Sequence, residues 1–208
     1  GRLACGRPAP RDPPRGRAGR GAALLSAATR RFRPGRQEAR HLKILISGAG
    51  IAGLSLALRL CQRGLKPVII EHSPTLRDGG YMLGLSDPGY DAAERMGVAE
   101  ALGAAQYMPR RIAHIGADGR TKFALQGRSL DILAGERQLN LMRGDIERIL
   151  YERLRDDAEF HFGASVATLD QAADGVRVRL DDATVIEADL AVGADGLHSN
   201  LRALAFGP

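Results

Sequence analysis

One short run of glycines constrains the fold of this chain more than any other feature. Gly48-Ala-Gly-Ile-Ala-Gly53 fits the pattern G-x-G-x-x-G. The apolar run Leu42–Gly48 leads into it as a buried strand would, and Ile51–Gln62 follows with the pattern of a helix. Gly64 is placed to end that helix, and Pro67–Glu71 is a second strand-like run. The sequence therefore predicts a βαβ unit with parallel strands, in an α/β, Rossmann-like domain.

Each glycine has a physical role in such a unit. Gly48 allows a tight turn out of the strand, Gly50 lets the backbone approach a pyrophosphate, and Gly53 permits close packing of helix against strand. The helix N-terminus offers unpaired N–H groups and the positive end of its dipole to phosphates. The predicted phosphate-binding loop consists of Gly48, Ala49, Gly50, Ile51, Ala52 and Gly53.

Glu71 strengthens the interpretation as a dinucleotide site. It closes the second strand, where its carboxylate can accept hydrogen bonds from ribose hydroxyls, and its charge repels a 2′-phosphate. NADP is therefore not expected at this site. Ala57, a second small residue on the helix, favours close packing on the sheet. The alternative is a glycine-rich turn in another α/β protein, with Glu71 only ending a strand.

Charge divides the chain into two parts. The net charge is +6, but residues 1–40, which contain eleven Arg and no Lys, carry +9, so the remaining residues carry −3. We expect residues 1–40 to be a disordered basic extension, with an organelle transit peptide or a basic arm for polyanions as alternatives. Residues 41–208 are predicted to form the folded domain, for which nucleic-acid binding is not indicated.

Cysteine usage and hydropathy exclude further classes. The two cysteines, Cys5 and Cys61, have no metal-site spacing, so no metal is expected. No apolar run approaches the roughly 20 residues that span a bilayer. We therefore expect a soluble, cytoplasmic protein without membrane contact.

Further elements follow from local patterns. Residues 72–87 are predicted to be a loop with little regular structure. Asp118-Gly119 predicts a hairpin between Arg111–Ala117 and Lys122–Leu125. The predicted helices are Gly89–Met96, Val98–Ala105 and Gly144–Arg155. The predicted strands are Phe160–Phe162, an antiparallel set of Ser165–Leu169, Val176–Leu180 and Thr184–Ala188, and Asp189–Ala194 parallel to the first two runs.

Three segments resemble one enzyme family. They are the residues after Glu71, which include Arg77, Gly79 and Gly80; Asn140-Leu-Met-Arg143-Gly-Asp145; and Gly193-Ala-Asp195-Gly196-Leu-His-Ser199 with Arg202. Over about Lys43 to Arg202 the chain is similar to FAD-dependent aromatic-ring hydroxylases, the flavoprotein monooxygenases of the para-hydroxybenzoate hydroxylase type.

The resemblance implies a cofactor and a reaction. The cofactor would be FAD, with NAD(P)H as a transient reductant, O₂ as the oxygen source and a small aromatic or polycyclic molecule as the substrate. Arg143 would contact the flavin's linking chain, Asp195 and Gly196 would support the pyrophosphate region, and Arg77 would lie in the cofactor loop. Asp195-Gly196 alone also fits a simple turn. We nominate no catalytic residue, because the chemistry belongs to the cofactor, and His198 is not expected to be catalytic.

The chain also departs from the family. Members are typically longer. In them a second flavin motif follows the Asp-Gly segment, and this second motif has no counterpart here. We therefore expect this chain to be the N-terminal part of such an enzyme, truncated before the substrate region. Two alternatives stay open: a nonenzymatic fragment that has only the fold, and an NAD-linked or other flavin oxidoreductase. The substrate and the oligomeric state are not predicted.

Overall fold

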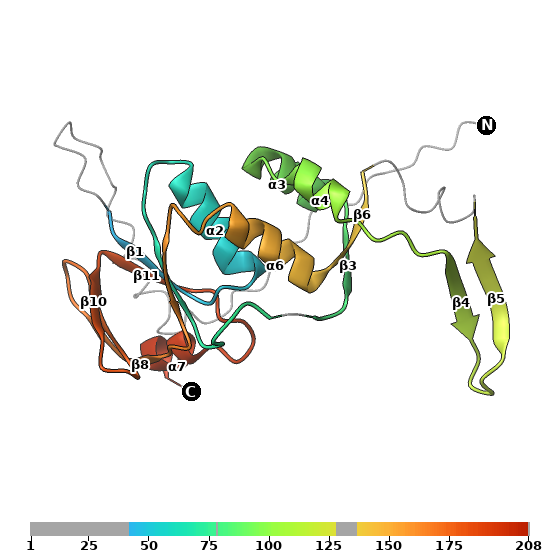
Figure 1. Cartoon of the computed structure of the whole chain (residues 1–208). Coiled ribbons are helices and arrows are strands. Elements are labelled where there is room, and N and C mark those ends of the chain that lie inside the picture. The colour runs from blue at the N-terminus through green and yellow to red at the C-terminus, as the bar shows by residue number, and fades with distance from the viewer. Residues whose placement is uncertain (1–41, 78, 128–136, 208) are drawn as a thin grey trace, which may run out of the picture. The chain divides into compact units, whose positions relative to one another are not determined.

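A four-stranded parallel sheet organises the structure, a computed structural model that describes residues 42–77, 79–127 and 137–207. Its strand order is β11-β1-β2-β7 (Figure 1). The strands are Leu190–Gly193, Ile44–Ser47, Val68–Glu71 and Glu159–Phe162. All neighbours pair in parallel, as predicted for the first two runs and for the last.

The two central strands of this sheet, β1 and β2, are buried on both faces, and alternate residues point to opposite sides. Ile44, Ile46 and Ile69 pack into one core, whereas Leu45 and Val68 pack into another. This explains why the strands appear in the sequence as continuous apolar runs rather than as an alternation.

Two helices cover the first face. α2 (Ile51–Cys61) connects β1 to β2, and α6 (Arg143–Glu152) packs beside it in the same core (Figure 1). α2 buries Leu54 and Ala57 and is followed by Gly64 at φ +78°, which is the predicted helix end. The predicted βαβ unit is confirmed.

A three-stranded antiparallel sheet contributes to the second core. Its order is β10-β9-β8, and the strands are Val185–Ala188, Val176–Leu180 and Val166–Gln171. Val178, Leu180 and Ile186 from this sheet share a core with Ile70 of the parallel sheet. The predicted antiparallel set is thus confirmed, with boundaries shifted by one or two residues. The mixed α/β fold with a parallel sheet and an antiparallel meander is as predicted.

The prediction missed three elements of regular structure. The predicted loop 72–87 contains a strand, β3 (Met82–Leu85), which pairs antiparallel with β6 (Leu139–Met142), a strand that the sequence did not indicate. The glycines and proline of this segment indicate a loop, and the strand forms only because it pairs with a segment far away in the sequence. A last helix, α7 (Asn200–Phe206), was also missed.

The remaining elements follow the prediction closely. α3 (Asp87–Met96) and α4 (Ala99–Ala104) are separated by Gly97 at φ +70°. β4 (Arg111–Ile115) and β5 (Thr121–Gln126) form the predicted hairpin. Residues 1–40, predicted to be a disordered extension, lie outside the described residues. In the part of the chain that is described, no helix is both long and apolar enough to cross a bilayer.

Candidate functional site

Close backbone contacts hold the glycine loop in place. Gly48 has φ +108°, its N–H donates to the Ile70 carbonyl at 2.7 Å, and a Cβ added to it would lie 2.5 Å from the Ala194 carbonyl oxygen. A Cβ on Gly53 would collide with the Gly48 carbonyl oxygen. Both positions therefore require glycine for reasons internal to the fold: a tight turn and close helix packing.

Gly50 is different, because the protein itself does not require glycine there. Its φ of −77° and ψ of −179° suit any residue. A Cβ would meet Glu147 Oε1 at 3.6 Å and Arg143 Nη2 at 3.7 Å, which are ordinary contact distances. α2 begins at this point without a side-chain cap, so no capping side chain stands between the N–H groups of its first turn and the pocket.

Glu71 lies across the loop from the helix start. Its Oε2 accepts the Ala49 N–H at 2.8 Å, and its Oε1 accepts the Ser73 N–H at 2.9 Å. A carboxylate has about four lone-pair directions, so acceptor capacity remains for a ligand hydroxyl. The half-buried Glu71 is thereby fixed in orientation while still able to bind.

The first turn of α6 supplies Arg143 and, one turn later, Glu147. Glu147 is buried, with a side chain only 3% exposed, and its Oε1 lies 2.7 Å from Arg143 Nη2. The approach has the distance of an ion pair but not the geometry of a hydrogen bond, and Oε1 finds no hydrogen-bond partner among the residues described. Burial raises the pKa of Glu147; Arg143 and Arg77 oppose this shift, and Glu71 adds to it.

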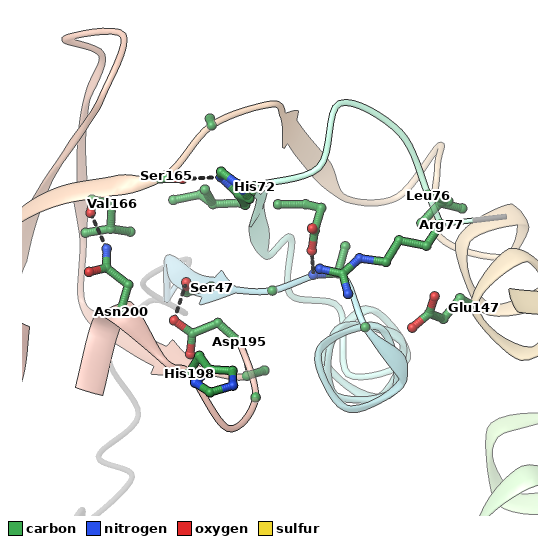
Figure 2. A pocket seen from close by; sticks show the side chains of 18 of the residues that line it. Ser47, His72, Leu76, Arg77, Glu147, Ser165, Val166, Asp195, His198 and Asn200 are labelled. Atoms are coloured by element: carbon green, nitrogen blue, oxygen red, sulfur yellow. Dashed lines mark hydrogen bonds between the residues drawn. The ribbon is translucent and has the colours of Figure 1, made fainter. Parts of the chain in front are cut away.

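Arg77 approaches the same place from the loop after β2. Its Nε donates to Ser73 Oγ at 3.3 Å. Figure 2 shows Arg77 and Glu147 on one side of the pocket, and Ser47, Asp195 and His198 on the other.

The Asp195 side is a closed hydrogen-bond network. Asp195 accepts from Ser199 Oγ at 2.5 Å and from the Leu201 N–H at 3.1 Å. It also accepts from Ser47 Oγ at 3.3 Å (Figure 2). Ser199 Oγ in turn accepts the Arg202 N–H and caps α7. Burial alone would raise the pKa of Asp195, but the bonds from Ser199, Leu201 and Ser47 outweigh it and hold the pKa below the ordinary value.

These groups enclose one pocket of about 600 Å³ at the carboxyl ends of the parallel strands. In open α/β sheets this is the edge where ligands bind. Of the predicted binding residues, all except Ile51, Ala52 and Gly53 line it. Those that line it are Gly48, Ala49, Gly50, Glu71, Arg77, Arg143, Asp195 and Gly196.

The pocket also contains residues that the sequence did not identify. Glu147, Ser165, Val166 and Asn200 line it, and so does His72, whose Nδ1 lies 2.9 Å from Ser165 Oγ. The i, i+4 spacing from Arg143 was the available signal for Glu147. The sequence carried no comparable signal for Ser165 and Val166, because the start of β8 reaches the pocket only through the packing of distant segments.

Comparison with known proteins gives a consistent picture. The family model described as "FAD binding domain" matches residues 41–205. An FAD-dependent monooxygenase, asL4, from Sarocladium schorii is 34% identical over 171 residues, 81% of this chain and 40% of that protein. A 3-amino-4-hydroxybenzoate 2-monooxygenase from Streptomyces cremeus is 33% identical over 78% of this chain and 42% of its own length.

A solved structure agrees. The tetracycline destructase Tet(55) superposes with a TM-score of 0.72 at 28% identity, over 82% of this chain and 42% of that one. The chain spans less than half the length of the curated relatives that it matches.

Proposed function

Since the chain belongs to the FAD binding domain family, we propose that its pocket holds the ADP part of FAD, as the cofactor-binding part of a flavin-dependent monooxygenase. The observation that carries this proposal is Gly50. It lines the pocket at an uncapped helix start, and no protein atom there excludes a side chain. The space beside it suits a phosphate.

The residues around the pocket fit the cofactor's chemistry. The first-turn N–H groups of α2 and the guanidinium of Arg143 would neutralise the pyrophosphate. Glu71 would accept hydrogen bonds from the adenosine ribose, oriented by the N–H groups of Ala49 and Ser73. Gly196, at φ +80° beside Asp195, would keep a side chain away from the phosphates, and Arg77 would add positive charge from the loop.

Bound FAD would supply the redox chemistry, taking electrons from NAD(P)H and delivering oxygen from O₂ to a small aromatic or polycyclic substrate. This chain's own residues bind, orient and neutralise the cofactor. No side chain is assigned to the reacting atoms. A cytoplasmic location is also part of the proposal, and it is supported by the low cysteine content of the chain.

Titration of the full chain with FAD, followed by flavin fluorescence, tests the binding proposal. We expect saturable binding that Gly50→Val abolishes, because the added methyl groups occupy the phosphate space. Gly103→Val is the matched control, since Gly103 lies in α4 with nothing within 4 Å of an added Cβ. Binding of NADH but not FAD would favour an NAD-linked reductase instead.

A second measurement separates an enzyme from a fragment that only binds. The chain with FAD is mixed with NADH or NADPH under air, and oxidation of the nicotinamide is followed by absorbance. Binding of FAD without any nicotinamide oxidation would support the cofactor site and contradict turnover by this chain.

A further inference from the structure

Glu147 is a buried carboxylate that the proposed cofactor contacts do not use. It lies on α6 with only 2% of its surface exposed, directly behind Gly50, and its Oε1 has no hydrogen-bond partner in the described structure. Burying a carboxylate without full hydrogen bonding is costly, so a buried acceptor beside a ligand space calls for a specific role.

The charges that face Glu147 come close to balance when the pocket holds no anion. Arg143 faces it from the same helix and Arg77 from the loop after β2, while Glu71 faces it from the end of β2. Hydrogen bonding from the backbone of Ile51, at the start of α2, is a further and smaller influence that lowers the pKa of Glu147. Two guanidinium groups thus stand against two carboxylates.

A pyrophosphate beside Gly50 would upset this balance. It adds two negative charges near Arg143. The guanidinium of Arg143 already contacts Glu147, so it would have to neutralise both groups. Like charges disfavour ionisation of a neighbouring acid, and the effect is large where water is excluded. The group with the least hydrogen bonding to its charged form, Glu147, is the one expected to change its protonation.

We propose that Glu147 is a positioning residue that holds Arg143 beside Gly50, and that it takes up one proton when the pyrophosphate of FAD binds. This inference rests on the proposed function, because it assigns a role to Glu147 only in a pocket that binds FAD. The proton comes from solvent, and no bond other than the O–H of the carboxyl forms.

Proton uptake gives FAD affinity a definite dependence on pH. Binding raises the pKa of Glu147, so a proton is taken up in the pH window between the free and bound values. Within that window the affinity falls as pH rises, by up to about tenfold per pH unit for one full proton. Outside that window, the protonation of Glu147 does not make the FAD affinity depend on pH.

The same helix supplies a matched control. Glu152 pairs with Arg148 at the same i, i+4 spacing, at 3.4 Å, but both side chains are about half exposed and neither lines the pocket. Glu152→Gln removes one glutamate charge from α6, as Glu147→Gln does, without touching the buried pair.

Calorimetric titration of the full chain with FAD, in buffers of different ionisation enthalpy between about pH 5 and 9, counts the protons. We expect uptake approaching one proton in the wild type and in Glu152→Gln. In Glu147→Gln we expect no uptake and an affinity that no longer falls with pH. Circular dichroism checks that each variant is folded.

Glu71→Gln keeps the test decisive if Glu147→Gln does not fold. At saturating FAD, uptake that persists in Glu71→Gln supports Glu147 as the acceptor, and uptake that vanishes overturns the proposal. Absence of uptake in the wild type, or unchanged uptake in folded Glu147→Gln, also overturns it. Failure of the wild type to bind FAD would instead contradict the proposed function.

Discussion

The two sides of the pocket treat a carboxylate in opposite ways. On one side Asp195 is half-buried and accepts hydrogen bonds from Ser47, Ser199 and the backbone of Leu201, and its pKa is lowered. On the other side Glu147 is more deeply buried and has one imperfect ion pair, and its pKa is raised. Burial alone would raise both, so hydrogen bonding decides the direction.

Gly48 and Gly50, which lie near these two acids, differ in a similar way. The Cβ of any larger residue at Gly48 would press on the backbone of Ala194 and Asp195, whereas at Gly50 it would only touch the ends of two side chains. On the Asp195 side, the need for glycine therefore comes from the packing of the protein itself. On the Glu147 side, space is available at Gly50 and Glu147 Oε1 has no hydrogen-bond partner in the described structure, and this is the side on which we propose that the pyrophosphate binds.

The strongest test of this contrast compares alanine at the two glycines. Gly48→Ala should lower the free energy of unfolding by about 3 kcal/mol or more, because it combines a positive φ with a backbone clash. Gly50→Ala should change it by less than about 1 kcal/mol, since its backbone is extended and space is available. Urea unfolding of the two variants measures both. Equal losses would mean that the two sides are packed alike.

Asp195→Asn tests the closed side. At neutral pH we expect a loss of about 1–3 kcal/mol, because the amide cannot accept from all three donors. The folded pKa of Asp195 lies below its unfolded value, so its stabilisation is present above the unfolded pKa and is lost as pH falls through the folded one.

The difference between wild type and Asp195→Asn should therefore shrink on acidification below about pH 4. Unfolding curves collected over that range give the answer. A difference that stays constant with pH would show that Asp195 acts through its shape and not its charge.

Local sequence patterns predicted the parts of the pocket that are formed by neighbouring segments of the chain. The glycine run, the apolar strands and Glu71 follow from periodicity and turn chemistry within about 30 residues, so β1, α2 and β2 were predictable. Asp195 was visible because it ends an apolar strand and precedes a glycine. Its partners Ser199 and Leu201 lie four and six residues further along the chain.

What the sequence did not reveal depends on contacts between distant segments. The pairing of β3 with β6 joins Met82–Leu85 to Leu139–Met142, and neither segment shows its partner locally. Glu147 stands in the sequence between Ile146 and Arg148, like a charge on an exposed helix face. Its burial arises only because α6 packs beside the start of α2, a fact of tertiary structure.

Glu147→Gln should have the smallest effect on stability and the opposite dependence on pH. The folded pKa is raised, so the native state binds more protons than the unfolded state between the two pKa values, and wild-type stability falls as pH rises through that window. The glutamine variant lacks this fall. At neutral pH it should match the wild type within about 1 kcal/mol, because the Arg143 side chain is 25% exposed and stays hydrated, so the substitution leaves no fully buried, unpaired charge. Urea unfolding at about pH 5 and 8 measures the difference, and a loss as large as that of Asp195→Asn would mean that Glu147 supports the fold in the way Asp195 does.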